Sequence, residues 1–306
     1  MDDATAAARA LSAGELVILP TETVYGLGAD AGNARAVARL YQAKDRPAFN
    51  PLIAHVADLA AAERVALLDD RALALARAFW PGPLTLVAPY RADGGVCDLA
   101  RAGLDTVAVR VPAHPLARAV LQAFGGPIVA PSANRSGRPS PTTRAAALAE
   151  TGAFAAGALD GGPCAVGLES TVISLLDGPA RLLRPGAITR AMAAAIVGPL
   201  ADAEADAKRS PGRLTRHYAP RAPMRLDVAA PAPGEAFLAF GPTPEGRGVF
   251  NLSPARDLAE AAANLFAFMR AADATAPRAI VVASIPQTGL GEAINDRLRR
   301  AAGFVG

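Results

Sequence analysis

Short runs of β-forming residues alternate with helical patterns along the chain from residue 15 to residue 198. Candidate strands occupy 16–20, 52–56, 84–89, 106–111, 128–130, 171–176 and 181–183. Candidate helices occupy 3–13, 33–44, 57–68, 69–79, 115–124, 142–151 and 188–197. This alternation predicts an α/β or α+β domain over residues 1–200.

The pattern changes over residues 201–223, where the chain is polar, is interrupted by proline and lacks apolar periodicity. We interpret this stretch as an interdomain linker. Beyond it, candidate strands at 236–240 and 279–283 and candidate helices at 256–272 and 291–302 predict a small α/β domain over 224–306. Two domains suit a chain of 306 residues, of which 52% are apolar.

Charge and apolar patterning exclude several classes of protein. With 31 basic and 28 acidic residues, the net charge of +3 permits an anionic substrate or transient contact with RNA but demands neither. No apolar run reaches the about 18 residues that a membrane span needs, and acidic residues stand where a signal peptide would be basic. Cys97 and Cys164 are too few for a disulfide framework. We therefore expect a cytoplasmic protein that does not associate with a membrane.

Several familiar motifs are missing from the sequence. Neither lysine follows the glycines of a phosphate loop, no Cys-x-x-Cys pair occurs, and Ser132 lies outside a Gly-x-Ser-x-Gly motif. Residues 26–31 match Gly-x-Gly-x-x-Ala, but no acidic residue at a strand end follows about 20 residues later to bind a ribose. We interpret Gly26 and Gly28 as ordinary turn glycines.

Short polar stretches remain, each at a predicted strand end or in a loop. They are residues 20–27, 44–52 with His55, 80–85, 109–112, 130–134, 167–171 and 183–186. Basic side chains from separate loops, together with hydroxyls and backbone N–H groups, suit an anionic ligand that carries several functional groups. The stretches therefore predict one site for such a ligand.

Four of these stretches resemble the YrdC-like threonylcarbamoyl-AMP synthases, in the same order along the chain. They are Pro-Thr-Glu-Thr-Val-Tyr-Gly-Leu at 20–27, Lys-x-Arg at 44–46, Ser-x-Asn at 132–134 and Glu-Ser-Thr-Val at 169–172. Ser-Pro-Gly at 210–212 and His-Tyr-x-Pro at 217–220 resemble the linker of the long, two-domain form of that family. The resemblance implies an α/β fold: a twisted mixed sheet with flanking helices around a concave basic cleft, plus a small Rossmann-like C-terminal domain.

The same resemblance implies a reaction. L-threonine, bicarbonate or carbon dioxide, and ATP with magnesium would give threonylcarbamoyl-AMP and pyrophosphate. Separate transfer proteins would then use the product to modify tRNA beside the anticodon; whether this chain itself binds tRNA stably stays open. Such a reaction needs no protein nucleophile, because a carbamate oxygen attacks the α-phosphorus of ATP, and catalysis requires positioning and fixed positive charge.

The site residues follow from the resemblance as well. Lys44 and Arg46 would be catalytic. The threonine side would consist of Thr23, His55, Arg110, Ala130 and Ser170. The ATP side would consist of Lys44, Arg46, Asn50, Thr106, Ser132, Asn134, Ser140, Arg184, His217 and Tyr218, with no protein ligand for a metal. Each hydroxyl or amide could instead satisfy the backbone of a turn.

Lys44 stands out because the chain contains 29 arginines but only two lysines, Lys44 and Lys208. An ammonium is a compact point charge, so a position crowded by phosphate or carbamate oxygens can require it in place of a planar guanidinium. The helix predicted over 33–44 ends at this residue. We therefore expect Lys44 and Arg46 at an exposed helix exit and not in a core.

The linker has two interpretations. It contains Arg213, Arg216, His217 and Tyr218, an unusual composition for a passive tether. It could be a solvated spacer, or it could be a lid that closes over the nucleotide and shields a labile intermediate from water.

Two other functions stay open. A module that binds double-stranded RNA or a nucleotide without synthase activity could use the same basic surface, although the mild charge argues against RNA. An enzyme that processes carbamoyl phosphate during metallocentre maturation would need zinc-binding cysteines and an acylphosphatase-like extension, which we do not find in this sequence.

Overall fold

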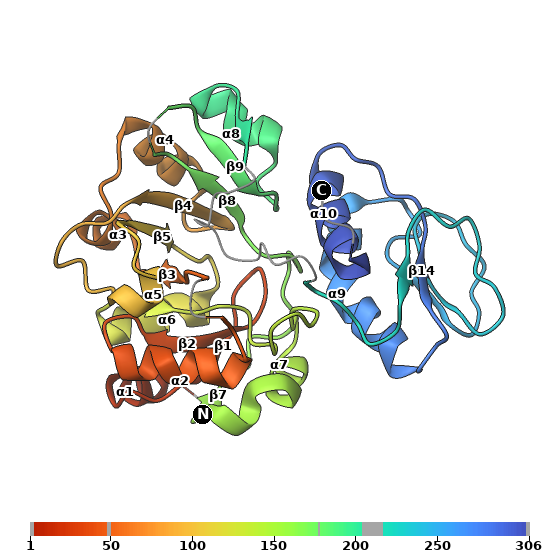
Figure 1. The fold of residues 1–306 in the computed structure, drawn as a ribbon, viewed down its shortest axis with the longest axis horizontal. Coiled ribbons are helices and arrows are strands. Elements are labelled where there is room, and N and C mark those ends of the chain that lie inside the picture. The colour runs from red at the N-terminus through yellow and green to blue at the C-terminus, as the bar shows by residue number, and fades with distance from the viewer. Residues whose placement is uncertain (1–2, 48–49, 177, 204–216, 304–306) are drawn as a thin grey trace.

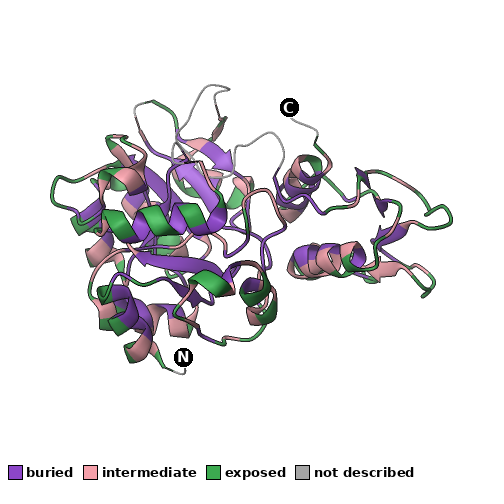
Figure 2. Cartoon of the chain, turned by 60° about the horizontal axis from the view of Figure 1, so that its bottom comes forward, coloured by how far each residue is buried: buried purple, intermediate pink, exposed green. Residues whose placement is uncertain are grey.

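Two α/β domains make up the computed structural model, which describes residues 3–47, 50–176, 178–203 and 217–303. Figure 1 shows the larger N-terminal domain on the left and the smaller C-terminal domain, in blue, on the right. Buried residues line the sheets and the inner faces of the helices in both domains (Figure 2). None of the helices in these described ranges combines the length and the apolar character that a membrane crossing requires.

Within the described residues, a mixed sheet of ten strands forms the N-terminal domain. Its strands are β1 (Val17–Leu19), β2 (Gly26–Asp30), β3 (Ile53–His55), β4 (Leu84–Pro89), β5 (Thr106–Arg110), β6 (Ile128–Val129), β7 (Gly157–Ala158), β8 (Thr171–Ser174), β9 (Arg181–Arg184) and β10 (Ala201–Asp202). Their order is β10-β9-β8-β4-β5-β3-β6-β2-β1-β7. β3 is parallel to β5 and β4 is parallel to β8, whereas β4 and β5 are antiparallel. The predicted mixed sheet is confirmed.

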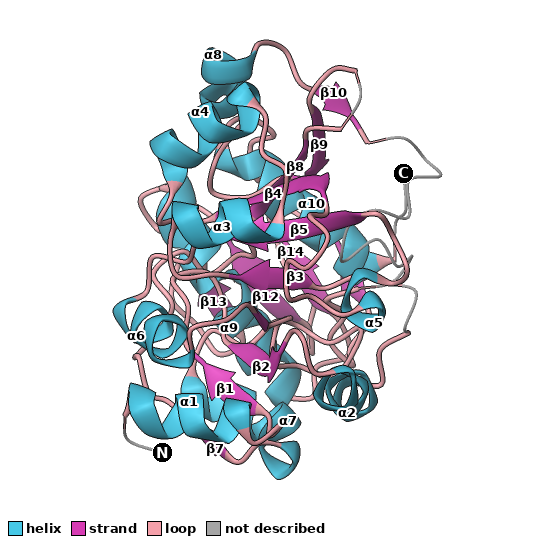
Figure 3. Cartoon of the chain, turned by 90° about the vertical axis from the view of Figure 1, so that its left-hand side faces the viewer, coloured by secondary structure: helices cyan, strands magenta, loops and turns pink. Residues whose placement is uncertain are grey.

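Helices flank this sheet. They are α1 (Ala4–Ser12), α2 (Ala34–Lys44), α3 (Leu59–Val65), α4 (Asp70–Phe79), α5 (Asp98–Arg101), α6 (Pro115–Phe124), α7 (Arg144–Thr151) and α8 (Arg190–Val197), with a 3₁₀ turn at Gly152–Phe154. α1 packs against α6, and α4 packs against α8. Figure 3 shows these four helices and α3 mainly on the left of the strands, α2 and α5 on the right, and the C-terminal domain behind. Each strand and helix predicted over residues 1–200 matches one of these elements to within three residues.

Strand β2 corrects the interpretation of Gly26 and Gly28 as turn glycines, which is wrong. Gly28 lies opposite Val17 in the antiparallel pair of β2 with β1. A Cβ atom on Gly28 would lie 3.0 Å from Cδ1 of Leu19, and a Cβ atom on Gly26 would lie 3.1 Å from that of Ala130. Glycine therefore admits close neighbours at both positions, and its low strand propensity explains why the sequence pattern did not indicate this strand.

In the part of the chain that the structure describes, the C-terminal domain contains a four-stranded parallel sheet and two helices. The strands β11 (Met224–Arg225), β12 (Ala236–Ala239), β13 (Val249–Asn251) and β14 (Ile280–Val282) lie in the order β11-β14-β12-β13. The helices are α9 (Leu258–Ala274) and α10 (Leu290–Ala302). Asp257 caps α9, because its side chain accepts hydrogen bonds from the N–H groups of Ala259 and Glu260. The predicted second α/β domain is confirmed.

The domain boundaries at residues 200 and 223 stay predictions. β10 lies parallel to β9 and extends the large sheet to Asp202. Most of the predicted linker, residues 204–216, lies outside the described residues, and the described chain resumes at His217.

Side chains from both domains meet in one apolar core. Val24 and Leu168, from loops of the N-terminal domain, belong to the core of the C-terminal domain together with Tyr218. Gly167, with a φ of +73°, lies directly against α9, where a Cβ atom would come within 2.5 Å of the helix backbone. An ion pair between Arg270 of α9 and Glu150 of α7 adds a polar contact at 2.9 Å. The C-terminal domain is therefore packed closely on the loops that precede β2 and β8.

We expect Gly167→Ala to lower the free energy of unfolding by about 2 to 4 kcal/mol, because it adds a clash with α9 to the cost of a positive φ. Gly234→Ala is the matched control, since Gly234 has a φ of +81° and no atom within 4 Å of its Cβ position. The control should lose only about 1 kcal/mol, the cost of the left-handed backbone alone. Urea denaturation of both variants measures the difference, and equal losses would mean that α9 does not need the close approach.

Candidate active site

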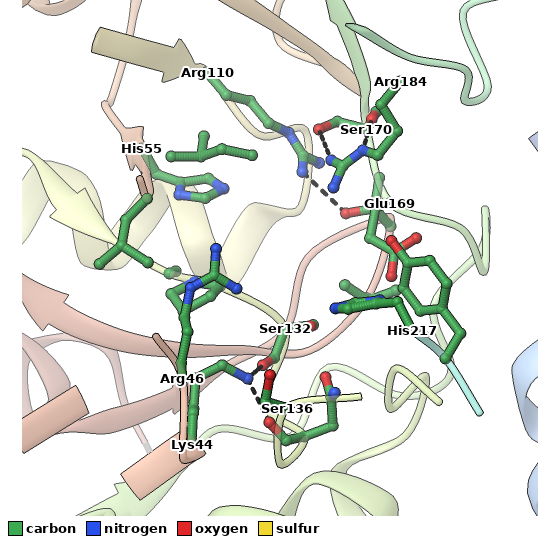
Figure 4. A pocket seen from close by; sticks show the side chains of 18 residues that line it. Lys44, Arg46, His55, Arg110, Ser132, Ser136, Glu169, Ser170, Arg184 and His217 are labelled. Carbon is green, nitrogen blue, oxygen red and sulfur yellow. Dashed lines mark hydrogen bonds between the residues drawn. The ribbon is translucent and has the colours of Figure 1, made fainter. Parts of the chain in front are cut away.

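A pocket opens at the edge of the large sheet where β3, β5 and β9 end and β8 begins (Figure 4). His55 ends β3, Arg110 ends β5, Arg184 ends β9, and Ser170 immediately precedes β8. The strand directions bring these four ends to one edge. The pocket is lined by Thr23, Val24, Lys44, Arg46, Leu52, Ile53, His55, Arg110, Ala130, Pro131, Ser132, Asn134, Ser136, Glu169, Ser170, Arg184, His217 and Tyr218.

Arg110 is held rigidly on one side of the pocket. Its Nε donates to the backbone oxygen of Gly82 at 3.2 Å, and its Nη1 donates to Oγ1 of Thr23 at 3.0 Å. Its Nη2 forms an ion pair with Glu22, which also accepts a hydrogen bond from the N–H of Ala113 at 3.0 Å. Burial raises the pKa of Glu22, but Arg110 outweighs burial and lowers it below its usual value. Since a guanidinium has five N–H donors, two N–H groups remain for a ligand.

Arg184 is fixed on another side of the pocket. Its Nε donates to the backbone oxygen of Ser170 at 3.0 Å, and its Nη2 donates to Oγ of Ser170 at 3.1 Å. The Ser170 hydroxyl also lies 2.7 Å from Oγ1 of Thr85. This arrangement holds a buried guanidinium beside the start of β8, and none of the carboxylates that the structure describes forms an ion pair with it.

Lys44 is buried, which corrects the expectation of an exposed helix exit. Only 1% of its surface is exposed, and Nζ donates hydrogen bonds to the backbone oxygens of Ser132 and Asn134. Burial, and then the charge of Arg46, lowers the pKa of Lys44 well below its usual value. Lys44 follows Val37, Leu40 and Tyr41 at helical spacing on the buried face of α2, so the last helical residue faces inward. One of the three N–H donors of Lys44 stays available for a ligand.

Arg46 lies next to Lys44 and is half-buried. Its Nη2 donates to the backbone oxygen of Pro51 at 3.2 Å, and Nε and Nη2 lie 3.4 Å from that of Asn50. Burial lowers the pKa of Arg46 to about 10, so it stays charged at neutral pH. The side chains of Lys44 and Arg46 therefore lie together at one end of the pocket.

Three residues that line the pocket contain buried polar atoms without partners. Among the described residues, no hydrogen-bond partner is present for Nδ1 of His55, Oδ1 of Asn134 or Nδ1 of His217. Burial lowers the pKa of both histidines to about 3, so both are neutral near pH 7 and can accept a hydrogen bond. An unsatisfied buried polar atom costs free energy, so these atoms fit a polar ligand.

Glu169 lines the pocket, although the sequence analysis gave it no role. Its Oε1 accepts a hydrogen bond from Oγ of Ser140, and its Oε2 accepts one from Nε of Arg297 on α10 at 2.8 Å. The Glu-Ser-Thr-Val motif was a signal for Glu169, but no local pattern indicated that Arg297 lies against it. The contact with Arg297 joins elements 128 residues apart.

Twelve of the fifteen predicted site residues line the pocket. Asn50 lies just outside it, where its backbone oxygen accepts a hydrogen bond from the Tyr41 hydroxyl at 2.9 Å. Ser140 lies behind Glu169. Thr106 begins β5, at the opposite end of the strand from Arg110. The roles of all fifteen residues stay predictions.

Comparisons with known proteins agree with these motifs. A family model described as telomere recombination matches residues 9–186, and one described as the C-terminal domain of threonylcarbamoyl-AMP synthase matches residues 187–303. The threonylcarbamoyl-AMP synthase of Bacillus subtilis is 40% identical to this chain, over 97% of the chain and 92% of that protein. The chain belongs to the threonylcarbamoyl-AMP synthase family.

Other relatives extend the family comparison to structure. The threonylcarbamoyl-AMP synthase of Pyrococcus abyssi is 39% identical over 95% of this chain and 91% of that protein. The crystal structure of P. abyssi Sua5 complexed with L-threonine has a TM-score of 0.91 and 37% identity, over 98% of this chain and 94% of that chain. The predicted family and its two-domain α/β fold are therefore confirmed.

Proposed function

We propose that this pocket joins L-threonine, bicarbonate or carbon dioxide, and ATP into threonylcarbamoyl-AMP, with release of pyrophosphate. The observation that carries the proposal is the convergence of Lys44, Arg46, Arg110 and Arg184 on one pocket that also contains unpartnered buried acceptors. Fixed cations of this kind bind carboxylate and phosphate groups, and the unpartnered acceptors bind donors such as a hydroxyl or an amine. The family to which the chain belongs supports the same reaction.

The chemistry explains why the site needs charge and not a nucleophile. The amine of threonine adds to carbon dioxide and loses a proton to give a carbamate. A carbamate oxygen then forms a bond to the α-phosphorus of ATP, and the bond to the β-phosphate oxygen breaks to release pyrophosphate. Both reactants are anions, so the enzyme must hold them together and stabilise the charge on the phosphate oxygens.

We assign the two substrates to two adjoining sets of residues, which meet where Arg184 donates to Ser170. The threonine side consists of Thr23, His55, Arg110, Ala130 and Ser170. There the two spare N–H groups of Arg110 would bind the carboxylate, and neutral His55 would accept a hydrogen bond from the substrate. The P. abyssi structure is a complex with L-threonine, which supports threonine as a substrate.

The ATP side consists of Lys44, Arg46, Asn50, Thr106, Ser132, Asn134, Ser140, Arg184, His217 and Tyr218. Lys44 and Arg46 would act as the catalytic charges, with the spare N–H of Lys44 directed to the reacting oxygens. His217 and Tyr218 line the pocket beside these cations, which supports a lid over the nucleotide. The remainder of the predicted lid, residues 204–216, lies outside the described residues.

Magnesium would enter with ATP and reduce the repulsion between the phosphates and the carbamate. Glu169 is the only carboxylate among the described residues that line the pocket, and both of its oxygens already accept hydrogen bonds. Because this carboxylate is already engaged, the lining residues fit a magnesium ion that is held by phosphate oxygens and water. We further propose that the protein acts in the cytoplasm and that its product passes to tRNA threonylcarbamoyl-transfer proteins.

Pyrophosphate release tests the proposed function. With ATP, bicarbonate and magnesium, we expect release to rise at least about 10-fold when L-threonine is added, because the carbamate of threonine is the attacking group. L-alanine is the control amino acid, since it lacks the hydroxyl. Release that does not depend on threonine would overturn the assignment, and tight binding of double-stranded RNA without release would favour the binding module.

A further inference from the structure

Arg297 links the C-terminal domain to the wall of the pocket. It lies on α10, none of its surface is exposed, and its Nε donates to Oε2 of Glu169 at 2.8 Å. Its Nη1 donates to Asp296 at 2.7 Å, and its guanidinium carbon lies 5.5 Å from the centre of the Tyr218 ring. Arg297 therefore contacts two residues that line the pocket, although it does not line the pocket itself.

Glu169 poses a problem for a site that binds an anion. It is the sole carboxylate among the described lining residues, and it lies on the same side as Arg184. Burial raises the pKa of Glu169, but Arg297, Arg184 and the Ser140 hydroxyl outweigh burial and lower it to about 2. Glu169 is therefore negatively charged at neutral pH, next to the proposed position of the ATP phosphates.

We propose that Arg297 is a positioning residue for the nucleotide site: it pairs with Glu169 and so keeps the charge of Arg184 available for the phosphates of ATP. The inference rests on the proposed assignment of Arg184 to the ATP side. It gives the C-terminal domain a part in substrate binding, because α10 supplies a charge that the N-terminal domain lacks at this point.

The contacts of Arg184 support this division of roles. Arg184 donates its hydrogen bonds to Ser170, whereas Glu169 accepts hydrogen bonds from Ser140 and Arg297. Without Arg297, a buried and charged Glu169 would have Arg184 as its remaining cationic neighbour. An ion pair between them would neutralise Arg184 and weaken the binding of ATP. The threonine side should be spared, because Arg110 has a separate carboxylate partner in Glu22.

Steady-state pyrophosphate release from four full-length variants tests the proposal. We expect Arg297→Met to raise KM for ATP at least about 10-fold, while KM for threonine stays within about 2-fold. The double variant Glu169→Gln/Arg297→Met removes both charges and should return KM for ATP to within about 3-fold of wild type. Arg299→Met is the matched control, since Arg299 is exposed on the same helix and donates to Gln287. Its two KM values should not change.

The KM for ATP of these variants decides whether Arg297 acts as a positioning residue. An unchanged KM for ATP in Arg297→Met, or a double variant that binds ATP no better than the single variant, would overturn the inference. If Arg297→Met does not fold, the double variant decides, because a KM for ATP raised about 10-fold in a folded double variant contradicts the proposal. Arg184→Gln, the fourth variant, distinguishes failure of the proposed ATP side from failure of the inference about Arg297. If Arg184→Gln leaves KM for ATP unchanged, the assignment of Arg184 to the ATP side is wrong. If Arg184→Gln raises KM for ATP but Arg297→Met does not, only the inference about Arg297 is wrong.

Discussion

Lys44→Arg is expected to lower kcat/KM for ATP at least about 100-fold, although the positive charge is kept. Lys44 is 1% exposed, and its ammonium donates to the backbone oxygens of both Ser132 and Asn134. A guanidinium is larger and planar, so it cannot place one compact charge between two carbonyl groups in the same space. The substitution would push this loop outward and move the charge away from the reacting oxygens. Steady-state pyrophosphate release measures the loss.

The control for this prediction is Arg35→Lys, the reverse exchange at an exposed position of the same helix. It should leave kcat/KM unchanged. Circular dichroism of Lys44→Arg should show a folded protein, so that the lost activity reports on the site. Activity of Lys44→Arg within about 3-fold of wild type would mean that charge alone suffices at this position.

Arg110→Met is expected to lower the free energy of unfolding by about 3 to 5 kcal/mol and to raise KM for threonine more than KM for ATP. Arg110 is 3% exposed and holds Glu22, Thr23 and the backbone of Gly82 together. Without Arg110, the carboxylate of Glu22 stays buried and keeps the N–H of Ala113 as a hydrogen-bond donor. Denaturation and steady-state kinetics measure the two effects separately.

Two further variants interpret the Arg110 result. Arg225→Met breaks an ion pair with Glu235 in which the Arg225 side chain is 56% exposed, so it should change stability little. Glu22→Gln/Arg110→Met removes both charges and should recover much of the stability, because no carboxylate is left buried. It should not recover KM for threonine. If threonine binds normally to either variant that lacks Arg110, the threonine side has been assigned to the wrong residues.

The sequence predicted most of the regular elements and twelve of the eighteen residues that line the pocket. Apolar periodicity predicted the helices and the longer strands, since each buries a continuous face. The motifs that resemble the family, found in the same order along the chain, predicted most of the residues that line the pocket. Short strands without such a face escaped prediction. β2 contains two glycines, and β7 and β10 have two residues each, so their pairing depends on neighbours that are distant in the sequence.

Burial and pairing across the domains were beyond the reach of local patterns. Lys44 ends its helix as predicted, but its side chain is buried and Nζ donates to two carbonyls about 90 positions away in the sequence. Glu169 was part of a recognised motif, yet its partner Arg297 lies in the other domain. Both features depend on tertiary packing, which a pattern of neighbouring residues does not encode.

The apolar core that Val24, Leu168 and Tyr218 share with the C-terminal domain also limits how the chain could change in evolution. A descendant that lost the C-terminal domain would expose Val24 and Leu168 to water beside its own active site. Such an apolar surface favours self-association, so deletion of the domain would need polar replacements at these two positions. Val24 lies next to Thr23 and Leu168 lies next to Glu169, so the same replacements would fall within the site itself. Loss of the C-terminal domain would therefore require substitutions within the site as well, and truncation alone would leave an apolar surface exposed.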